Sequence, residues 1–286
     1  MPSLRHLSAT IAAALTLALV GGCGGGDDGG DDVTKGLAPT EILARGRDAA
    51  GGLDSYRVAL DAKVDPTVRP GRAPGGLAAI LAAPVEIDGE GRVTRPNAMS
   101  LDVKLTVREL PVQANLTLIG GGVYLTVFGQ DFKVGAAGGE KAGLRPPQLA
   151  ATLLGWMESP TEVGREKSDG VSTVHLRGTV GAEAALGDLG TLAGALGGTP
   201  DAGAAKRGPA LVKESTVDVW IGTADLLPRR IAIDARLQGR LDAIPELSAL
   251  TLTANVRFSG FNDPVEITAP AGAKPLDLGD LPSLGC

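Results

Sequence analysis

Apolar and polar residues alternate strictly along much of this 286-residue chain. Residues 56–64 read YRVALDAKV, and the same period of two recurs in residues 99–107, 110–118, 123–127, 217–221, 231–238 and 250–258. Because successive side chains of a strand point to opposite faces, each segment predicts a strand with one apolar and one polar face. Short turns between consecutive segments indicate an antiparallel sheet with water on one side, which excludes a doubly wound nucleotide-binding fold.

Four short segments have helical character instead. Residues 40–50 begin at Thr40, a possible N-cap, and stop at a glycine pair. Residues 76–83 lie between two prolines, residues 146–157 open with proline, and residues 181–197 carry leucines spaced three and four apart. Four helices of this length are too few to cover both faces of a long sheet, and we expect them to cap its concave side.

The N-terminus has the layout of an export signal. Arg5 precedes an apolar run over residues 11–20, and small residues then lead to Cys23. The run is about half of the ~20 residues that a membrane-spanning helix requires. Residues 20–23 (VGGC) resemble the bacterial lipobox, which implies cleavage before Cys23, a diacylglycerol on its sulfur, and anchoring to a membrane. An ordinary secretory signal with an incidental cysteine is the alternative.

A segment without apolar side chains follows the cysteine. Residues 24–32 read GGGDDGGDD, which predicts a flexible anionic spacer, since such a segment cannot bury enough surface to order itself. Calcium binding by its aspartates is the alternative, but the run lacks the spacing of a calcium loop. We therefore expect a signal peptide over residues 1–22, a lipidated cysteine and flexible tether over 23–35, one folded domain over 36–276, and a tail over 277–286.

Charge and residue types argue against several function classes. The net charge of −6 and the lack of a basic cluster argue against nucleic acid as a partner. If Cys23 is lipidated, Cys286 has no intramolecular partner and is a free thiol, an intermolecular bridge or incidental. Of the two histidines, His6 leaves with the signal, and alternation places His175 on the polar side of a strand, where we expect it exposed. The sequence contains no nucleophile motif, metal-ligand cluster or phosphate-binding loop, so we expect neither enzymatic activity nor a metal or cofactor.

Short motifs in three places carry a family resemblance. Residues 53–58 (LDSYRV) follow the first expected helix, residues 217–221 (VDVWI) are followed after a turn by residues 226–231 (LLPRRI), and residues 258–270 read FSGFNDPVEITAP. With these features the chain resembles the LppX/LprG-type lipoproteins of mycobacteria and related bacteria, whose architecture is similar to that of the periplasmic lipoprotein carrier LolA. The resemblance covers roughly residues 36–276. A glycine-rich insert around residues 181–208 and the C-terminal tail depart from it.

The resemblance implies an α+β fold in which a strongly curved antiparallel sheet, a half-barrel, has helices packed on its concave face. It also implies an apolar cavity for acyl chains of envelope lipids or glycolipids, palmitate among them. The candidate lining residues are the inward members of the alternating segments: Leu101, Val103, Leu105, Leu116, Leu118, Leu125, Val219, Ile221, Ile233, Leu252 and Val256. A filled core would show the same periodicity, so a cavity and a packed core both remain open.

Two functions of different class follow from these alternatives. The first is a carrier, anchored through Cys23 on the outer face of a bacterial cell membrane, that binds a lipid or glycolipid and shields it during transfer through the envelope, with an envelope transport protein as a possible partner. The second is a structural, adaptor or lipid-sensing lipoprotein with a filled core. An apolar void of several hundred Å³ would favour the carrier, and an exposed apolar patch without a void would favour the adaptor.

Overall fold

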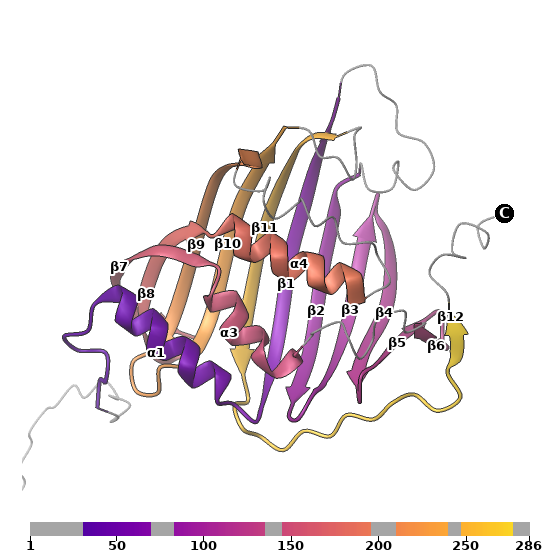
Figure 1. Ribbon diagram of the computed structural model, residues 1–286, viewed down its shortest axis with the longest axis horizontal. Coiled ribbons are helices and arrows are strands. Elements are labelled where there is room, and N and C mark those ends of the chain that lie inside the picture. The colour runs from indigo at the N-terminus through magenta and orange to yellow at the C-terminus, as the bar shows by residue number, and fades with distance from the viewer. Residues whose placement is uncertain (1–30, 70–82, 135–144, 196–209, 240–246, 277–286) are drawn as a thin grey trace, which may run out of the picture.

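The computed structural model describes residues 31–69, 83–134, 145–195, 210–239 and 247–276. One 12-stranded sheet spans them, in the order β12-β6-β5-β4-β3-β2-β1-β11-β10-β9-β8-β7. Every neighbouring pair is antiparallel except β12 and β6, which are parallel. The sheet is curved and does not close, and the helices lie on one of its faces (Figure 1). The expected α+β half-barrel is therefore confirmed.

All seven expected strands are present, and β3–β4, β4–β5, β9–β10 and β10–β11 pair antiparallel. They are β1 (Ser55–Val68), β3 (Ala98–Val107), β4 (Leu110–Ile119), β5 (Gly122–Val127), β9 (Val212–Gly222), β10 (Pro228–Gln238) and β11 (Leu247–Ser259). The others are β2 (Val85–Thr94), β6 (Gln130–Val134), β7 (Met157–Ser168), β8 (Val171–Val180) and β12 (Lys274–Leu276). Central strand β1 pairs with β11, so the first and last long strands lie side by side in the middle of the sheet.

The helices lie close to their expected positions. They are α1 (Pro39–Gly51), the 3₁₀ turn η1 (Pro146–Gln148), α3 (Leu149–Leu154) and α4 (Ala182–Ala195). The N-cap of α1 is Ala38 rather than Thr40, because Pro39 already occupies the first turn, where proline is tolerated. No helix in the described ranges is long and apolar enough to cross a bilayer. The expected signal peptide, Cys23, most of the expected helix over 76–83 and the tail with Cys286 lie outside the described residues.

The core forms where α1 and α3 cover the sheet. Ile42 of α1 and Leu154 of α3 are fully buried against inward side chains of β8, β9 and β10, such as Leu176 and Ile231. Tyr56 of β1 joins the helices to the sheet, because its hydroxyl donates a hydrogen bond of 3.0 Å to the carbonyl of Pro146. The same oxygen accepts a 3.4 Å bond from the backbone N–H of Ala150. This half of the helix-facing surface is thus a tightly packed core.

The chain preceding α1 is held against the edge of the sheet. The N–H of Val33 donates to the carbonyl of Thr223, at 2.9 Å. Thr34 is fully buried and accepts a hydrogen bond from Arg165 of β7 at 2.9 Å, and Arg165 also forms an ion pair with Asp32. Asp32, Val33 and Thr34, which the sequence analysis assigned to the tether, therefore contact the sheet near its β7 edge.

The C-terminal segment crosses the ends of the strands. After β11, residues 260–273 run along one end of the sheet to β12, as the yellow segment of Figure 1 shows. The side-chain oxygen of Asn262 accepts a 2.9 Å hydrogen bond from the N–H of Asp54, and the N–H of Asn262 donates to the carbonyl of Ser55 at 2.8 Å. This segment brings β12 beside β6 and covers an edge that would otherwise be open.

Candidate functional site

The eleven candidate lining residues all lie on the helix-facing side of the sheet. The strand register aligns Leu101 with Leu116, and Leu116 with Leu125, across β3, β4 and β5. On the other side of β1, Val256 aligns with Ile231, and Ile231 with Val219. The alternation therefore predicted the correct face for every candidate, but the structure separates them into two groups, with Leu118 in a third, small cluster.

One group belongs to the packed core. Val219 and Ile221 have 0% exposure, and Ile233 and Val256 have 6% each. A side chain with no accessible surface has no space beside it for even a water molecule, so Val219 and Ile221 have no room for a ligand in this structure. Leu118 lies in a separate small cluster with Val123 and Val134.

The other group is only half-buried and lies towards β2–β5. Its candidate members are Leu101, Val103, Leu105, Leu116, Leu125 and Leu252. The register places further half-buried aliphatic side chains beside them, which the sequence reading did not single out: Leu60, Ala62, Val64, Ile87, Val112, Ala114 and Val127. We call these two sets together the aliphatic surface. It is continuous across β11, β1, β2, β3, β4 and β5, and it lies outside the sealed core beneath α1 and α3.

Two inward-facing glycines of β2 shape the aliphatic surface. At Gly91, a Cβ would lie 2.9 Å from Leu101 Cδ1 and 3.0 Å from Val58 Cγ1, so neighbouring side chains already fill that position. At Gly89, a Cβ would lie 3.5 Å from Leu101 Cδ1 and 3.7 Å from Leu60 Cβ, which are ordinary contacts. Gly89 therefore leaves a hollow among the aliphatic side chains, whereas Gly91 allows close packing.

Helix α4 crosses in front of β11, β1 and β2 in Figure 1. It is attached at its start: the N–H of Gly181 donates to the carbonyl of Trp156 at 2.6 Å, and the Trp156 indole N–H donates to Asp188 at 2.8 Å. Ala185 is buried, but Leu189 is 46% exposed. Among the side chains of α4 that the structure describes, these polar contacts lie in the first half of the helix.

Two grooves lie on the opposite, outer face. One has a volume of about 850 Å³ and lies over β2–β5, and the other, of about 390 Å³, lies over β10, β11, β1 and β2. Their linings are dominated by outward polar side chains, among them Asp88, which borders both. They are therefore separate from the aliphatic surface.

His175 is on the outer face as expected, but the expectation that it is exposed is wrong. It is only 8% exposed, because its ring stacks on Trp220 with a centroid distance of 4.3 Å. Its Nε2 lies 2.6 Å from an oxygen of Asp218, and its Nδ1 lies 3.2 Å from Glu166. The guanidinium group of Arg230 also lies over the Trp220 ring, 4.6 Å from the ring centroid.

Both ring nitrogens of His175 therefore lie beside carboxylates, and one face of its ring stacks on an indole. Arg177 adds a 2.8 Å hydrogen bond to the same oxygen of Asp218. The arrangement cross-links β7, β8 and β9 on the outer face, and burial of a polar cluster is tolerated when its members satisfy one another. Among the described residues, no group of three or more His, Cys, Asp or Glu side chains could hold a metal ion.

The comparisons with known proteins find structural likeness only. No family model and no curated protein matches the sequence. LprF from Mycobacterium bovis is 19% identical, with a TM-score of 0.49 over 82% of this chain and 100% of that chain. The lipoprotein LppX from Mycobacterium tuberculosis is 19% identical, with a TM-score of 0.40 over 79% of this chain and 98% of that chain.

A LolA superfamily protein from Nitrosomonas europaea is 9% identical, with a TM-score of 0.25 over 81% of this chain and 96% of that chain. LprF and LppX are lipoproteins of the group that the sequence resembles.

Proposed function

We propose that this protein is an exported lipoprotein that holds acyl chains of a lipid or glycolipid against its aliphatic surface and carries them through the cell envelope. Cys23 would anchor it to the outer face of the bacterial cell membrane, and an envelope transport protein would receive or supply the lipid. The function requires burial of a chain and no bond-making step, so we expect no enzymatic activity.

The observation that supports this proposal is the contrast between the two halves of the helix-facing side. Beneath α1 and α3 the side chains are sealed, whereas the members of the aliphatic surface, on β11, β1 and β2–β5, remain half-buried. Soluble proteins seldom leave a continuous aliphatic surface of this kind unless another apolar group covers it. A flexible acyl chain fits such a surface because it can follow irregular contours and needs no hydrogen bonds.

The free energy of acyl-chain burial is large enough for binding and small enough to permit release. Each methylene that leaves water contributes about 0.8 kcal/mol, so burial of ten methylenes gives roughly 8 kcal/mol before the costs of association. Those costs leave an affinity well short of irreversible binding, and a second chain would strengthen it. Motion of α4, whose Asp188 is hydrogen-bonded to Trp156, would then expose the chain for release.

The test is native mass spectrometry of residues 24–286, expressed in an actinobacterial host and purified without detergent. We expect adducts with the masses of diacyl or triacyl lipids. Val103→Trp places a large ring on the aliphatic surface and should reduce these adducts strongly. Thr106→Trp is the matched control, because it adds the same ring to the same strand on the outer face.

A bare protein mass, unchanged after incubation with lipids extracted from the host envelope, would contradict the carrier. The adaptor or lipid-sensing alternative predicts that result. Equal adducts in both tryptophan variants would place the lipid elsewhere on the molecule.

A further inference from the structure

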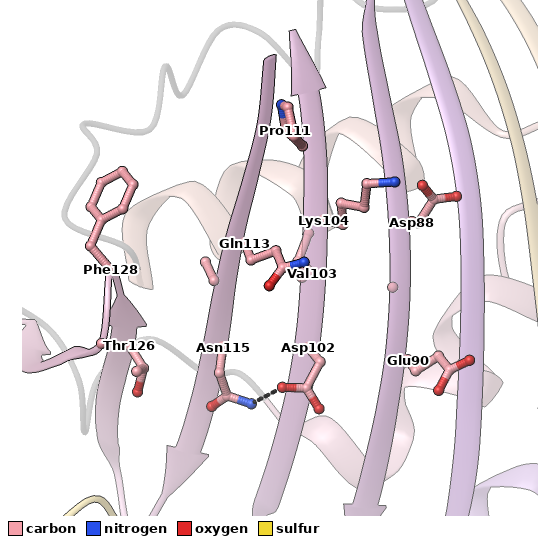
Figure 2. Close-up of a pocket in the computed structure, with 13 residues that line it drawn as sticks. Asp88, Glu90, Asp102, Val103, Lys104, Pro111, Gln113, Asn115, Thr126 and Phe128 are labelled. Atoms are coloured by element: carbon pink, nitrogen blue, oxygen red, sulfur yellow. Dashed lines mark hydrogen bonds between the residues drawn. The ribbon is translucent and has the colours of Figure 1, made fainter. Parts of the chain in front are cut away.

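The larger outer groove has a composition that the proposed lipid function does not use. It has a volume of about 850 Å³ and lies over β2, β3, β4 and β5, on the face opposite the helices (Figure 2). The backbone of the sheet separates it from the aliphatic surface. A groove of this volume is within the range of small-molecule binding sites and can hold an extended ligand.

Its polar side chains lie in two rows across the strands. One row contains Asp88, Lys104 and Gln113, and the other contains Glu90, Asp102, Asn115 and Thr126. Within the described part of the chain, the side chains of Asp88, Glu90, Lys104 and Gln113 make no hydrogen bond or ion pair. The groove therefore contains carboxylates, an amide and an ammonium group that no described residue engages in a hydrogen bond or ion pair. The carboxylates can accept hydrogen bonds, the ammonium group can donate them, and the amide can do both.

One part of this charge arrangement is unfavourable for folding, although Asp88 and Lys104 place opposite charges directly across from each other on β2 and β3. Glu90 and Asp102 are directly opposite each other on β2 and β3, and like charges in that position destabilise a sheet. Asn115 relieves this only in part, through a 2.8 Å hydrogen bond to Asp102, which Figure 2 shows. A ligand that donates hydrogen bonds to both carboxylates would offset the repulsion.

An exposed aromatic ring stands at the rim of the groove. Phe128 is 85% exposed and has a φ of +52°, in the two-residue turn with Gly129 that joins β5 to β6. Such turns favour Asn-Gly, and a bulky residue in the left-handed region costs about 1–2 kcal/mol. Phe128 thus has an unfavourable backbone conformation and an apolar ring in water, which points to a role at the surface.

We propose that this groove binds a neutral oligosaccharide. Sugar hydroxyls donate to carboxylates and exchange hydrogen bonds with amides, and the C–H face of a sugar ring stacks on an aromatic ring such as Phe128. Strands lie roughly 4.8 Å apart, so a glycan lying across them meets a new polar side chain at about the repeat of its own rings. The groove has three carboxylates and one ammonium, which disfavours anionic ligands.

The experiment is binding of the full chain, purified in detergent, to immobilised maltohexaose, cellohexaose and mannohexaose, with sulfated and phosphorylated hexaoses for comparison. We expect at least one neutral hexaose to bind and the anionic ones to bind more weakly. Phe128→Ala should weaken binding at least about tenfold, which corresponds to about 1.4 kcal/mol. Gln113→Ala should also weaken it.

Leu110→Ala and Glu214→Gln are the matched controls. Leu110 is 70% exposed at the turn between β3 and β4 and does not line the groove, and Glu214 is an exposed outward carboxylate on β9. Both variants should bind as the unaltered chain does. Absence of binding to every neutral hexaose, preference for the anionic ones, or unchanged binding by Phe128→Ala would each overturn the proposal.

Discussion

Ile221 and Leu116 occupy the same face of one sheet, yet the structure predicts opposite consequences of truncating them. Ile221 has no accessible surface, and its Cδ1 lies 3.1 Å from where a Cβ would stand on Gly46 of α1. Leu116 is half-buried on the aliphatic surface. Ile221→Ala should therefore cost stability, whereas Leu116→Ala should mainly cost lipid binding.

The magnitudes follow from burial. Truncating a sealed isoleucine to alanine costs about 2–5 kcal/mol, because the cavity that is left cannot collapse fully. At roughly 2–4 °C per kcal/mol for a domain of this size, Ile221→Ala should lower the melting temperature by about 4–20 °C. The half-buried Leu116 should lose about 1 kcal/mol of stability, or about 2–4 °C. If an acyl chain covers its other half, Leu116→Ala should also weaken lipid binding by about 1–2 kcal/mol, roughly 5- to 30-fold.

The assay uses residues 24–286 after removal of bound lipid. Calorimetry measures the melting temperature, and displacement of a fluorescent fatty acid measures affinity for acyl chains. Equal weakening of fatty-acid binding by Leu116→Ala and by an Ile221→Ala variant that is still folded by circular dichroism would contradict this division of roles. Unchanged affinity of Leu116→Ala would mean that the aliphatic surface is not the lipid site.

Three further substitutions test other parts of the structure. Tyr56→Phe removes a buried hydroxyl that bonds the start of α3, so we expect a loss of about 1–3 kcal/mol in urea unfolding, and a neutral result would contradict that role. Gly91→Ala should destabilise by more than Gly89→Ala, because only the former clashes with packed neighbours; equal calorimetric effects would refute the packing argument. Partial burial would raise the pKa of Asp32, but hydrogen bonds from the hydroxyl and N–H of the nearby threonine and the charge of Arg165 hold it below its usual range. Its contribution is therefore present at neutral pH and is lost as pH falls through the lowered pKa, so Asp32→Asn should melt lower at pH 7 and the difference should shrink as the pH falls below about 4; a difference that stays constant into acid would contradict this.

The sequence pattern predicted strands best where inward positions are aliphatic and outward positions are polar. Alternation identified β3 and β4, whose inward positions are all aliphatic. Strand β2 was missed because Gly89 and Gly91 occupy inward positions and interrupt the apolar period. Strand β7 was missed because it contains Pro160 and two register shifts, which break the alternation in an edge strand.

For the candidate site, the sequence could predict which face of the sheet each residue lies on, but not how deeply it is buried there. Val219 and Leu116 follow the same alternation and are indistinguishable within their own strands. Their burial differs because β9 lies beneath α1 and α3 and β4 does not, and that depends on the order of strands around β1. The burial of His175 likewise depends on Trp220 and Asp218 of the neighbouring strand. Pairings of this kind between distant segments have no local signal.

The two proposed sites share a backbone, and this limits what one ligand can do. On β3, Val103 points to the aliphatic surface while its neighbours Asp102 and Lys104 point to the outer groove, since adjacent side chains of a strand lie on opposite faces. The hydrogen-bonded sheet leaves no passage between them, so a glycolipid with its acyl chains on one face could reach the groove only around an edge. The nearer edge is that of β6 and β12, next to the turn that carries Phe128. Fatty acid and hexaose should therefore bind simultaneously and without competition, and mutual exclusion would contradict the placement of the two sites on opposite faces.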